Sequence, residues 1–359
     1  MKLIHVSDLH IGKRLHERLL LEDQKFVLDQ VIELVIKEKA DGLVIAGDVY
    51  DRNVPSESAV RLFNDFISKL AEKNIPVYCI SGNHDSAERL DFLRNLLKIN
   101  KVYIAGVQAE KISCHDEYGP YNIYLLPYKK MEELHEILSE MKVDTGQRNI
   151  LVAHAFVVGS EMNIRCESEL ISIGGADEIS AHSFSDFDYV ALGHLHTKQE
   201  VAPGVWYAGS PLMYSFSEVG HSKCALIIEM KEKGQCNIGK HELKPLHPLR
   251  AIKGPLQELV AKENVSQGDS QDYIRATLTD EEELMEPMKA LREVYPNVLR
   301  MDIENSRTAQ SDQVLSADKI ENRTFFQLFD EFYEKQNNQC MNEKERNLLD
   351  IMWKKIGED

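Results

Sequence analysis

Five short polar fragments, each directly after an apolar run, constrain this chain more than any other feature of its sequence. The apolar runs are KLIHVS (2–7), LVIA (43–46), VYCI (77–80), ILVA (150–153) and DYVAL (188–192). The polar residues that follow them are Asp8 and His10, Asp48 and Asp51, Asn83 and His84, His154, and His194 and His196. Short apolar runs that stop at polar residues are typical of buried strands. Because groups just beyond strand ends converge on one edge of an open sheet, we expect these fragments to form one site.

The spacing of the other apolar residues predicts an α/β fold. Residues 22–38 carry apolar side chains at helical spacing, Ser56 can cap a second helix, and a third is expected near 86–98. The first hundred residues therefore read as alternating strands and helices. Strand-like runs dominate from 101 to 230, with one helix near 130–142, so we expect a second sheet packed on the first. The segment 155–185 is polar and predicts a long surface excursion.

The C-terminal third predicts two further parts. The proline-containing segment KPLHPLR (244–250) follows a first domain that we place at 1–243. Helices at 255–263 and 280–293 and strands at 271–278 and 297–303 predict a small α/β domain over 244–303. Residues 304–318 are polar and predict a linker. Residues 319–359 predict a helical tail, whose first helix, at 323–335, is crowded with aromatic side chains.

Composition limits the classes of protein that fit. The 42 Lys and Arg residues against 59 Asp and Glu residues give a net charge of −17, which argues against a histone-like binder of nucleic acid. The negative net charge is compatible with a nuclease whose cationic residues cluster locally. The six cysteines form no C-x-x-C pair, so we expect neither a disulfide framework nor a zinc ribbon. The first ten residues lack the apolar core of a signal peptide, and no run of 18 apolar residues occurs, which predicts a cytoplasmic protein without a membrane span.

The residue types in the five fragments indicate metal chemistry. Carboxylate, amide oxygen and imidazole together suit Mn, Fe or Zn better than Ca or Mg. One carboxylate can bridge two cations, and two cations can clamp the attacking and leaving oxygens of an in-line displacement at phosphorus. Each fragment alone has a plainer explanation, such as an Asx turn at Asp48 or a structural role for His154. Their common position after strands favours a two-metal phosphoesterase.

The motifs DLHIG, GDVYDR, GNHD and GHLH, with the isolated strand-end histidine, resemble the calcineurin-like metallophosphoesterase superfamily over about residues 1–240. SDLHIGKRLH and GSPLMYSFSEVGHSK (209–223) are similar to the bacterial SbcD nuclease family, whose members work with an SMC-like ATPase. The resemblance implies a two-sheet sandwich flanked by helices. It also implies that 244–303 caps DNA and that 319–359 binds the ATPase partner.

The resemblance also implies roles for single residues. Asp8, His10 and His196 hold one metal, Asp48 bridges to the second, and Asn83, His154 and His194 complete the second site. His84 matches a histidine that does not bind metal but faces the scissile phosphate, and Mn²⁺ is the usual metal. Asp51 stands where archaeal and eukaryotic relatives have a second catalytic histidine, and it either orients His84 or only ends the turn. Asn53 and Asp85 depart from the protein phosphatase pattern.

The favoured function is a two-metal DNA phosphodiesterase, the nuclease subunit of an SbcCD-type complex. The family likeness implies 3′–5′ digestion of double-stranded DNA ends and opening of hairpins, by a homodimer within a heterotetramer that contains two ATPase subunits. One alternative is a stand-alone metallophosphoesterase acting on a small molecule or phosphoprotein. Another is a DNA-end-binding scaffold with vestigial metals. The C-terminal third favours the nuclease, because a small-molecule phosphatase needs neither a second domain nor a helical tail.

Overall fold

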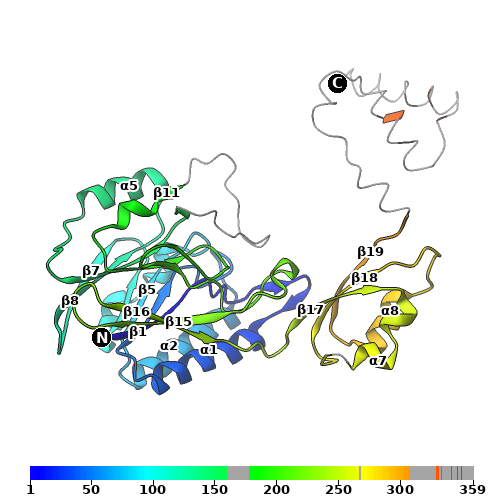
Figure 1. The fold of residues 1–359 in the computed structure, drawn as a ribbon, viewed down its shortest axis with the longest axis horizontal. Coiled ribbons are helices and arrows are strands. Elements are labelled where there is room, and N and C mark those ends of the chain that lie inside the picture. Colours follow the sequence, from blue (N-terminus) through cyan, green and yellow to red (C-terminus); the bar gives the residue numbers. More distant parts are fainter. Residues whose placement is uncertain are drawn as a thin grey trace.

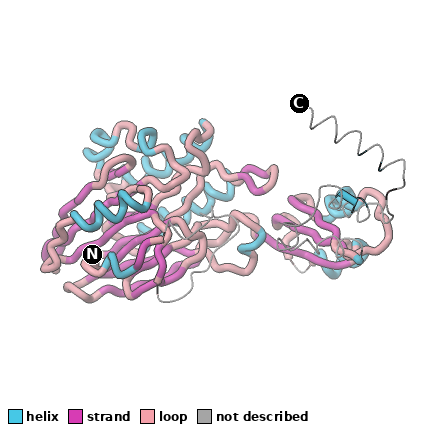
Figure 2. The backbone as a smooth tube through the Cα atoms, turned by 90° about the horizontal axis from the view of Figure 1, so that it is seen from above, coloured by secondary structure: helices cyan, strands magenta, loops and turns pink. Residues whose placement is uncertain are grey.

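The computed structural model describes residues 1–159, 178–266 and 268–306, together with positions 329, 330, 333, 341, 346 and 349. A larger N-terminal body contains two sheets, and a smaller three-stranded unit lies at its side (Figures 1 and 2). Residues 160–177 of the predicted excursion, most of the predicted linker and almost all of the predicted tail lie outside the described residues.

The first sheet has the order β16-β15-β1-β4-β5-β6. Four strands are parallel, namely β1 (Lys2–Val6), β4 (Gly42–Ala46), β5 (Val77–Ile80) and β6 (Val102–Ala105). The antiparallel strands β15 (Cys224–Met230) and β16 (Cys236–Glu242) extend it at one edge. Helices α1 (Leu21–Lys37) and α2 (Glu57–Glu72) lie together along one side of this sheet (Figure 1). Ser56 caps α2 as predicted, since its side chain accepts a hydrogen bond from the backbone N–H of Ala59.

The second sheet has the order β13-β14-β12-β9-β8-β7. Its strands are β7 (Glu110–Asp116), β8 (Gly119–Leu126), β9 (Arg148–His154), β12 (Tyr189–Gly193), β13 (Gln199–Ala202) and β14 (Val205–Tyr207). Apolar side chains of both sheets, including Leu3, Val44, Ile123 and Val152, form a shared buried core. Helix α5 (Met131–Glu140) and the 3₁₀ turn Ala181–Phe184 contribute to a separate core on the second sheet's other face. The predicted two-sheet α/β sandwich is therefore confirmed.

Several elements differ from the sequence-based expectation. The edge strands β7, β13 and β16 and the hairpin of β2 (Arg14–Leu15) and β3 (Arg18–Leu19) were not predicted, because each is very short or interrupted by polar residues and gives no continuous apolar run. The short strands β10 (Val157–Val158) and β11 (Ile179–Ser180) pair within the predicted excursion. The helix expected near 86–98 is two short helices, α3 (Ala87–Leu90) and α4 (Arg94–Leu97), followed by a 3₁₀ turn, Lys98–Asn100. The break lies at Leu93, whose left-handed backbone (φ 61°) cannot continue a helix.

The smaller unit is a parallel sheet of β17 (Leu249–Gly254), β18 (Tyr273–Leu278) and β19 (Val298–Ile303), with helices α6 (Leu256–Leu259), α7 (Lys262–Val265) and α8 (Pro287–Val294). The helix predicted at 280–293 begins only at Pro287, because proline fits the first helical position and disrupts a helix interior. Asp280 instead accepts a hydrogen bond from the backbone N–H of Leu256 at 2.9 Å.

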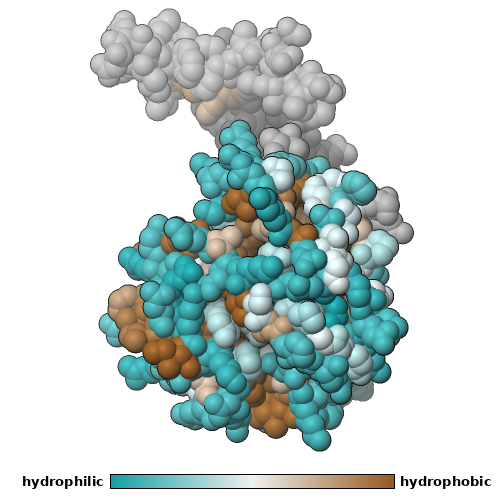
Figure 3. Space-filling model, turned by 90° about the vertical axis from the view of Figure 1, so that its left-hand side faces the viewer, coloured by the Kyte–Doolittle hydropathy of each residue, from teal (hydrophilic) through white to brown (hydrophobic). Residues whose placement is uncertain are grey.

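The carboxylate of Asp23 on α1 ties the two parts together. It accepts hydrogen bonds from the Tyr273 hydroxyl and from His247 Nδ1, each at 2.8 Å. No helix within the described ranges is both long and apolar enough to cross a membrane. The face drawn in Figure 3 is largely hydrophilic, with apolar side chains gathered in separate patches.

Candidate metal centre

The predicted site residues lie at neighbouring strand ends of both sheets. Asp8, Asp48 and Asn83 follow β1, β4 and β5 of the first sheet. His154 ends β9, and His194 and His196 follow β12, in the second sheet. The structure thus brings the five fragments to one place, where the facing edges of the two sheets meet.

The glycines of these motifs allow the loops to approach closely. A Cβ atom on Gly82 would lie 2.1 Å from Asp48 Oδ1, and one on Gly193 would lie 1.9 Å from the carbonyl oxygen of Ala46. Only glycine fits such contacts. Four predicted metal ligands also have positive φ angles, which are uncommon for residues other than glycine, namely Asp8 (53°), His10 (42°), Asp48 (49°) and His194 (109°). Strain of this kind collects at functional sites, where the surrounding structure maintains it.

The two aspartates each use one oxygen to hold a neighbouring loop. Asp48 Oδ1 accepts the backbone N–H of His84 at 2.8 Å, and Asp8 Oδ1 accepts that of His194 at 2.9 Å. The other oxygens face the site. Asp48 Oδ2 lies 3.6 Å from His10 Nε2 and 3.5 Å from His154 Nε2. Asp8 Oδ2 is buried and has no hydrogen-bond partner among the residues that the structure describes.

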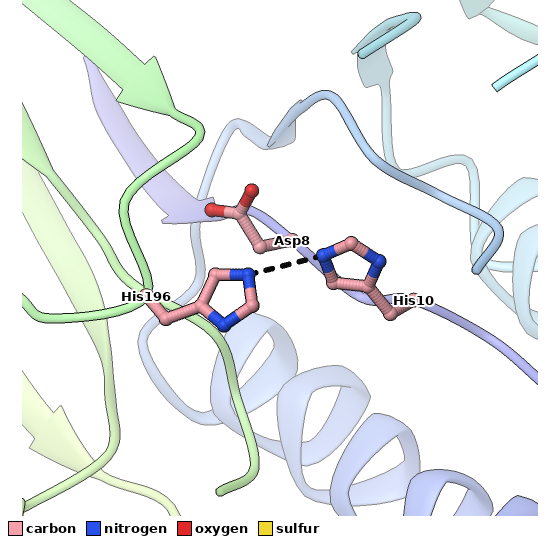
Figure 4. Close-up of side chains that lie close together, drawn as sticks. All are labelled: Asp8, His10 and His196. Carbon is pink, nitrogen blue, oxygen red and sulfur yellow. Dashed lines mark hydrogen bonds between the residues drawn. The ribbon is translucent and has the colours of Figure 1, made fainter. Parts of the chain in front are cut away.

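The imidazoles form two groups on either side of Asp48. His10 Nε2 and His196 Nε2 lie 3.1 Å apart beside the carboxylate of Asp8 (Figure 4). In the other group, Asn83 Oδ1 lies 2.9 Å from His154 Nε2 and 3.2 Å from His194 Nδ1. Among the residues that the structure describes, three overlapping sets have donor atoms within 4.8 Å of one another: Asp8, His10 and His196; Asp8, Asp48 and His154; and His10, Asp48 and His84.

Buried negative charge dominates the electrostatics. Burial alone would raise the pKa of Asp48, but His154 and His10 hold it well below its usual value. Burial also works to lower the pKa of His154, yet Asp48 and Asp8 raise it to about 9. Burial raises the pKa of Asp8, whose inward oxygen has no partner among the described residues. The centre therefore needs positive charge.

These residues fit divalent cations. Without a cation, a proton on His154 balances the negative charge of the carboxylates, and a bound cation would take over that role. The mixture of oxygen and imidazole donors suits Mn²⁺, Fe²⁺ or Zn²⁺. The backbone supports this arrangement, because His154 Nδ1 lies 2.9 Å from the carbonyl oxygen of Ala46 and donates to it, which leaves Nε2 on the side of the site. When bound, such ions polarise a phosphate ester and lower the pKa of water.

Comparison with known proteins identifies the family of this chain. The calcineurin-like phosphoesterase family matches residues 1–198, more than half of the chain, and the type 5 capsule protein repressor C-terminal domain (SbcD_C) matches residues 245–337. The SbcD subunit of the nuclease SbcCD from Staphylococcus epidermidis is 34% identical over 322 residues, which cover 84% of this chain and 85% of that protein. This chain belongs to the SbcD family of calcineurin-like phosphoesterases. It is a hydrolase of the metallophosphoesterase type and a nuclease subunit.

Two solved structures are also similar to this SbcD-family chain. A dimetal phosphatase from Danio rerio has a TM-score of 0.42 and 11% identity, covering 68% of this chain and 97% of that one. The phosphoesterase Yfce from E. coli has a TM-score of 0.28 and 12% identity, covering 68% of this chain and 100% of that one.

Of the two residues predicted to be catalytic in this SbcD-family chain, His84 lies nearer solvent than His10, against which its ring packs at a centroid distance of 4.8 Å. His84 Nδ1 lies 3.1 Å from the backbone carbonyl oxygen of Asp51, a contact that does not involve the Asp51 side chain. The Asp51 carboxylate lies elsewhere, with Oδ1 2.9 Å from Lys13 Nζ and 3.8 Å from His10 Nδ1.

Two further residues position the loops, and sequence reasoning did not assign them this role. Asp85 is buried, and its carboxylate accepts the backbone N–H groups of Val49, Tyr50 and Gly82 at 3.0, 2.8 and 2.9 Å. Gln24 accepts the N–H of Gly12 at 2.9 Å and donates to the carbonyl of His10 at 2.7 Å. Asp85 had a signal in the sequence, since it ends the GNHD motif. Gln24 had none, because it lies on α1 outside every motif.

Proposed function

We propose that this SbcD-family chain is a cytoplasmic two-metal DNA phosphodiesterase, the nuclease subunit of an SbcCD-type complex. It digests double-stranded DNA ends from the 3′ side and opens hairpins in DNA repair, recombination and replication. The first metal is held by Asp8, His10 and His196, and Asp48 bridges it to a second metal held by Asn83, His154 and His194. Mn²⁺ is the proposed metal, and His84 acts on the phosphate.

A basic cleft beside the metal centre is the main observation that supports DNA as the substrate. Its volume is about 270 Å³, and its lining includes Lys13, Arg14, Arg275 and Arg300. Lys13 also contacts Asp51 at the metal centre, so the cleft begins where the chemistry takes place. Arg275 and Arg300 come from β18 and β19 of the smaller unit. Arg275 and Arg300 share the single carboxylate of Asp302, at 2.7 and 2.8 Å, and Lys13 pairs with Asp51. The four cations therefore outnumber their acidic partners, and on a chain of net charge −17 this cluster fits a phosphate backbone that continues beyond the scissile bond.

Replacing both Arg275 and Arg300 by alanine is expected to weaken duplex DNA binding by about tenfold and to lower the slope of its salt dependence by about two. Hydrolysis of a nitrophenyl phosphodiester should stay at the wild-type rate, because that substrate does not reach the smaller unit. DNA binding at several salt concentrations, with small-substrate kinetics, checks both. The matched control is Lys253→Ala with Lys289→Ala, which removes the same charge from the same unit outside the cleft lining. Unchanged DNA binding in the arginine variant would favour a stand-alone phosphoesterase acting on small molecules.

We propose that the chain forms a homodimer through a patch of apolar side chains at residues 92–99. Phe92, Leu93, Leu96 and Ile99 are 71%, 50%, 58% and 77% exposed. No other stretch of eight described residues exposes as many large apolar side chains. The family resemblance implies a dimer, so we expect this patch to contact the same patch on a second copy of the chain.

Phe92→Glu with Ile99→Glu is expected to convert a dimer into a monomer, since each copy would bury two charges at the interface. Light scattering on the protein as it elutes from a size-exclusion column gives the molar mass of the assembly directly. Met285→Glu is the control, because Met285 is 94% exposed in the smaller unit and lies outside the patch. A double variant that stayed dimeric would place the interface elsewhere.

We propose that residues 319–359, which lie almost wholly outside the described residues, bind the SbcC-like ATPase. The support is the sequence alone, where Phe325, Phe326, Leu328, Phe329 and Phe332 crowd one predicted helix. Deleting 319–359 is expected to abolish co-purification with the ATPase while sparing hydrolysis of a nitrophenyl phosphodiester. Full-strength binding of the truncated protein would refute this docking site.

A further inference from the structure

A buried ion pair lies behind one histidine of the first metal group. Glu218, on the 3₁₀ turn Phe216–Glu218, has a side chain that is 0% exposed. Its Oε1 lies 3.9 Å from His196 Nδ1, and its Oε2 lies 2.5 Å from Lys223 Nζ. Lys223 Nζ also donates to the carbonyl oxygen of His196 and to Ser210 Oγ, each at 2.9 Å. Both members of the ion pair therefore contact the residue whose Nε2 faces the metal centre.

The other histidine of this group has a similar arrangement, in which one carboxylate oxygen faces both the ring and a lysine. His10 Nδ1 lies 3.8 Å from Asp51 Oδ1, which lies 2.9 Å from Lys13 Nζ. Since His10 and His196 point their Nε2 atoms toward each other at 3.1 Å, each presents its Nδ1 edge to a carboxylate with a lysine behind it. His154 in the second group differs, because its Nδ1 meets a neutral backbone carbonyl.

Glu218 also has a structural contact, since its Oε1 accepts the backbone N–H of Tyr214 at 3.2 Å, but a neutral glutamine could accept that bond as well. A structural role alone therefore explains the buried charges of the Glu218–Lys223 pair poorly. Burying two charges costs free energy that their attraction does not reliably recover, and apolar residues of similar volume usually stabilise a fold as well or better. A carboxylate near the outer nitrogen of a metal-bound histidine favours a proton on that nitrogen and makes the ring a better ligand. At 3.8 and 3.9 Å, the contacts of Asp51 and Glu218 act through charge and not through a hydrogen bond. That function requires the charge to lie where Glu218 and Asp51 lie.

We infer that Glu218 and Asp51, each paired with a lysine, are positioning residues that hold His196 and His10 for the first metal and leave the second metal's affinity unchanged. The inference rests on the proposed assignment of the two metal sites. It predicts an asymmetric centre, in which charged outer partners strengthen only the site of Asp8, His10 and His196.

Calorimetric titration of the metal-stripped full chain with Mn²⁺ tests this inference without depending on activity. Glu218→Gln keeps the size of the side chain and an acceptor for Lys223 but removes the charge. It is expected to weaken one Mn²⁺ site by about 10- to 100-fold and to leave the other at the wild-type affinity. The same substitution in a His154→Ala background, where the first site is expected to bind alone, should show the full loss.

Asp116→Asn is the matched control. Asp116 pairs with Arg148, whose side chain is 2% exposed, through a contact of 2.5 Å that involves none of the proposed metal ligands. It should lower the unfolding temperature of the metal-free protein and leave both Mn²⁺ affinities unchanged. Asp51→Asn should weaken the same single site as Glu218→Gln. Because the Asp51 side chain is 11% exposed, this substitution is less disruptive to folding, and it tests the inference if Glu218→Gln does not fold.

Two results would overturn the inference. One is a wild-type affinity at both sites in Glu218→Gln or Asp51→Asn, and the other is an equal loss at both sites. A wild-type chain that binds no Mn²⁺ would instead refute the metal assignment itself, so the two failures are distinguishable.

Discussion

Replacing Asp48 by alanine is expected to remove both metals and to reduce phosphodiester hydrolysis to background. Asp48 Oδ2 lies between His10 and His154, at 3.6 and 3.5 Å, so it faces both metal groups at once. Its other oxygen holds the backbone of His84, so the loop that carries the catalytic histidine also loses its anchor. Metal content by mass spectrometry after equilibration with Mn²⁺, measured with the hydrolysis rate, checks the expectation.

Asp65→Ala is the control for this substitution, because Asp65 is an exposed aspartate on α2, away from the metal centre. It should retain the metal content and rate of the wild type. An Asp48→Ala protein that kept one metal at wild-type affinity would show that Asp48 serves a single site and does not bridge two.

His84→Ala is expected to lower turnover by about 10²- to 10⁴-fold, the usual scale for a general acid or charge stabiliser, while both metals stay bound. A carbonyl oxygen can only accept, so the contact between His84 Nδ1 and the Asp51 carbonyl places a proton on Nδ1. Nε2 then carries only a lone pair in the neutral ring, so it is the imidazolium form whose Nε2–H can donate to a phosphate oxygen and stabilise its charge, or transfer its proton to the leaving oxygen.

The competing role for His84 is metal binding, since it belongs to a set of possible donors with His10 and Asp48. Metal content separates the two roles. A His84→Ala protein depleted of metal would make His84 a ligand, whereas a fully loaded and slow protein supports its proposed action on the phosphate.

The strands that lead into the site were predictable because each is a short apolar run that stops at a polar residue. The edge strands β7, β13 and β16 were not, since one face of an edge strand can be polar and then gives no continuous apolar signal. His5 was predicted to be a packed side chain, and it is fully buried with Nδ1 3.0 Å from the Tyr189 hydroxyl. Burial lowers its pKa to about 3, in keeping with that prediction.

The outer parts of the site depend on tertiary contacts that no local pattern encodes. Asp85, Gln24 and Glu218 each bind backbone or side-chain atoms of a loop that is distant in sequence or reached only through the fold. A buried acid in the polar stretch 209–223 looks like a solvated surface residue until the packing of that stretch is known. Motif spacing therefore indicated the residues that face the centre, and the structure adds the residues that hold them.

Hydrolysis of a duplex DNA end and of a nitrophenyl phosphodiester by metal-stripped protein, titrated with Mn²⁺ or Mg²⁺ and assayed with and without the ATPase partner, tests the central claim most directly. We expect no activity without metal and recovery on both substrates with Mn²⁺ that exceeds recovery with Mg²⁺, because five imidazoles around the centre favour a borderline metal. DNA digestion should also increase with the ATPase and ATP. Hydrolysis that proceeds without added metal, or that is restored on the small phosphodiester and never on DNA, would contradict a two-metal DNA phosphodiesterase.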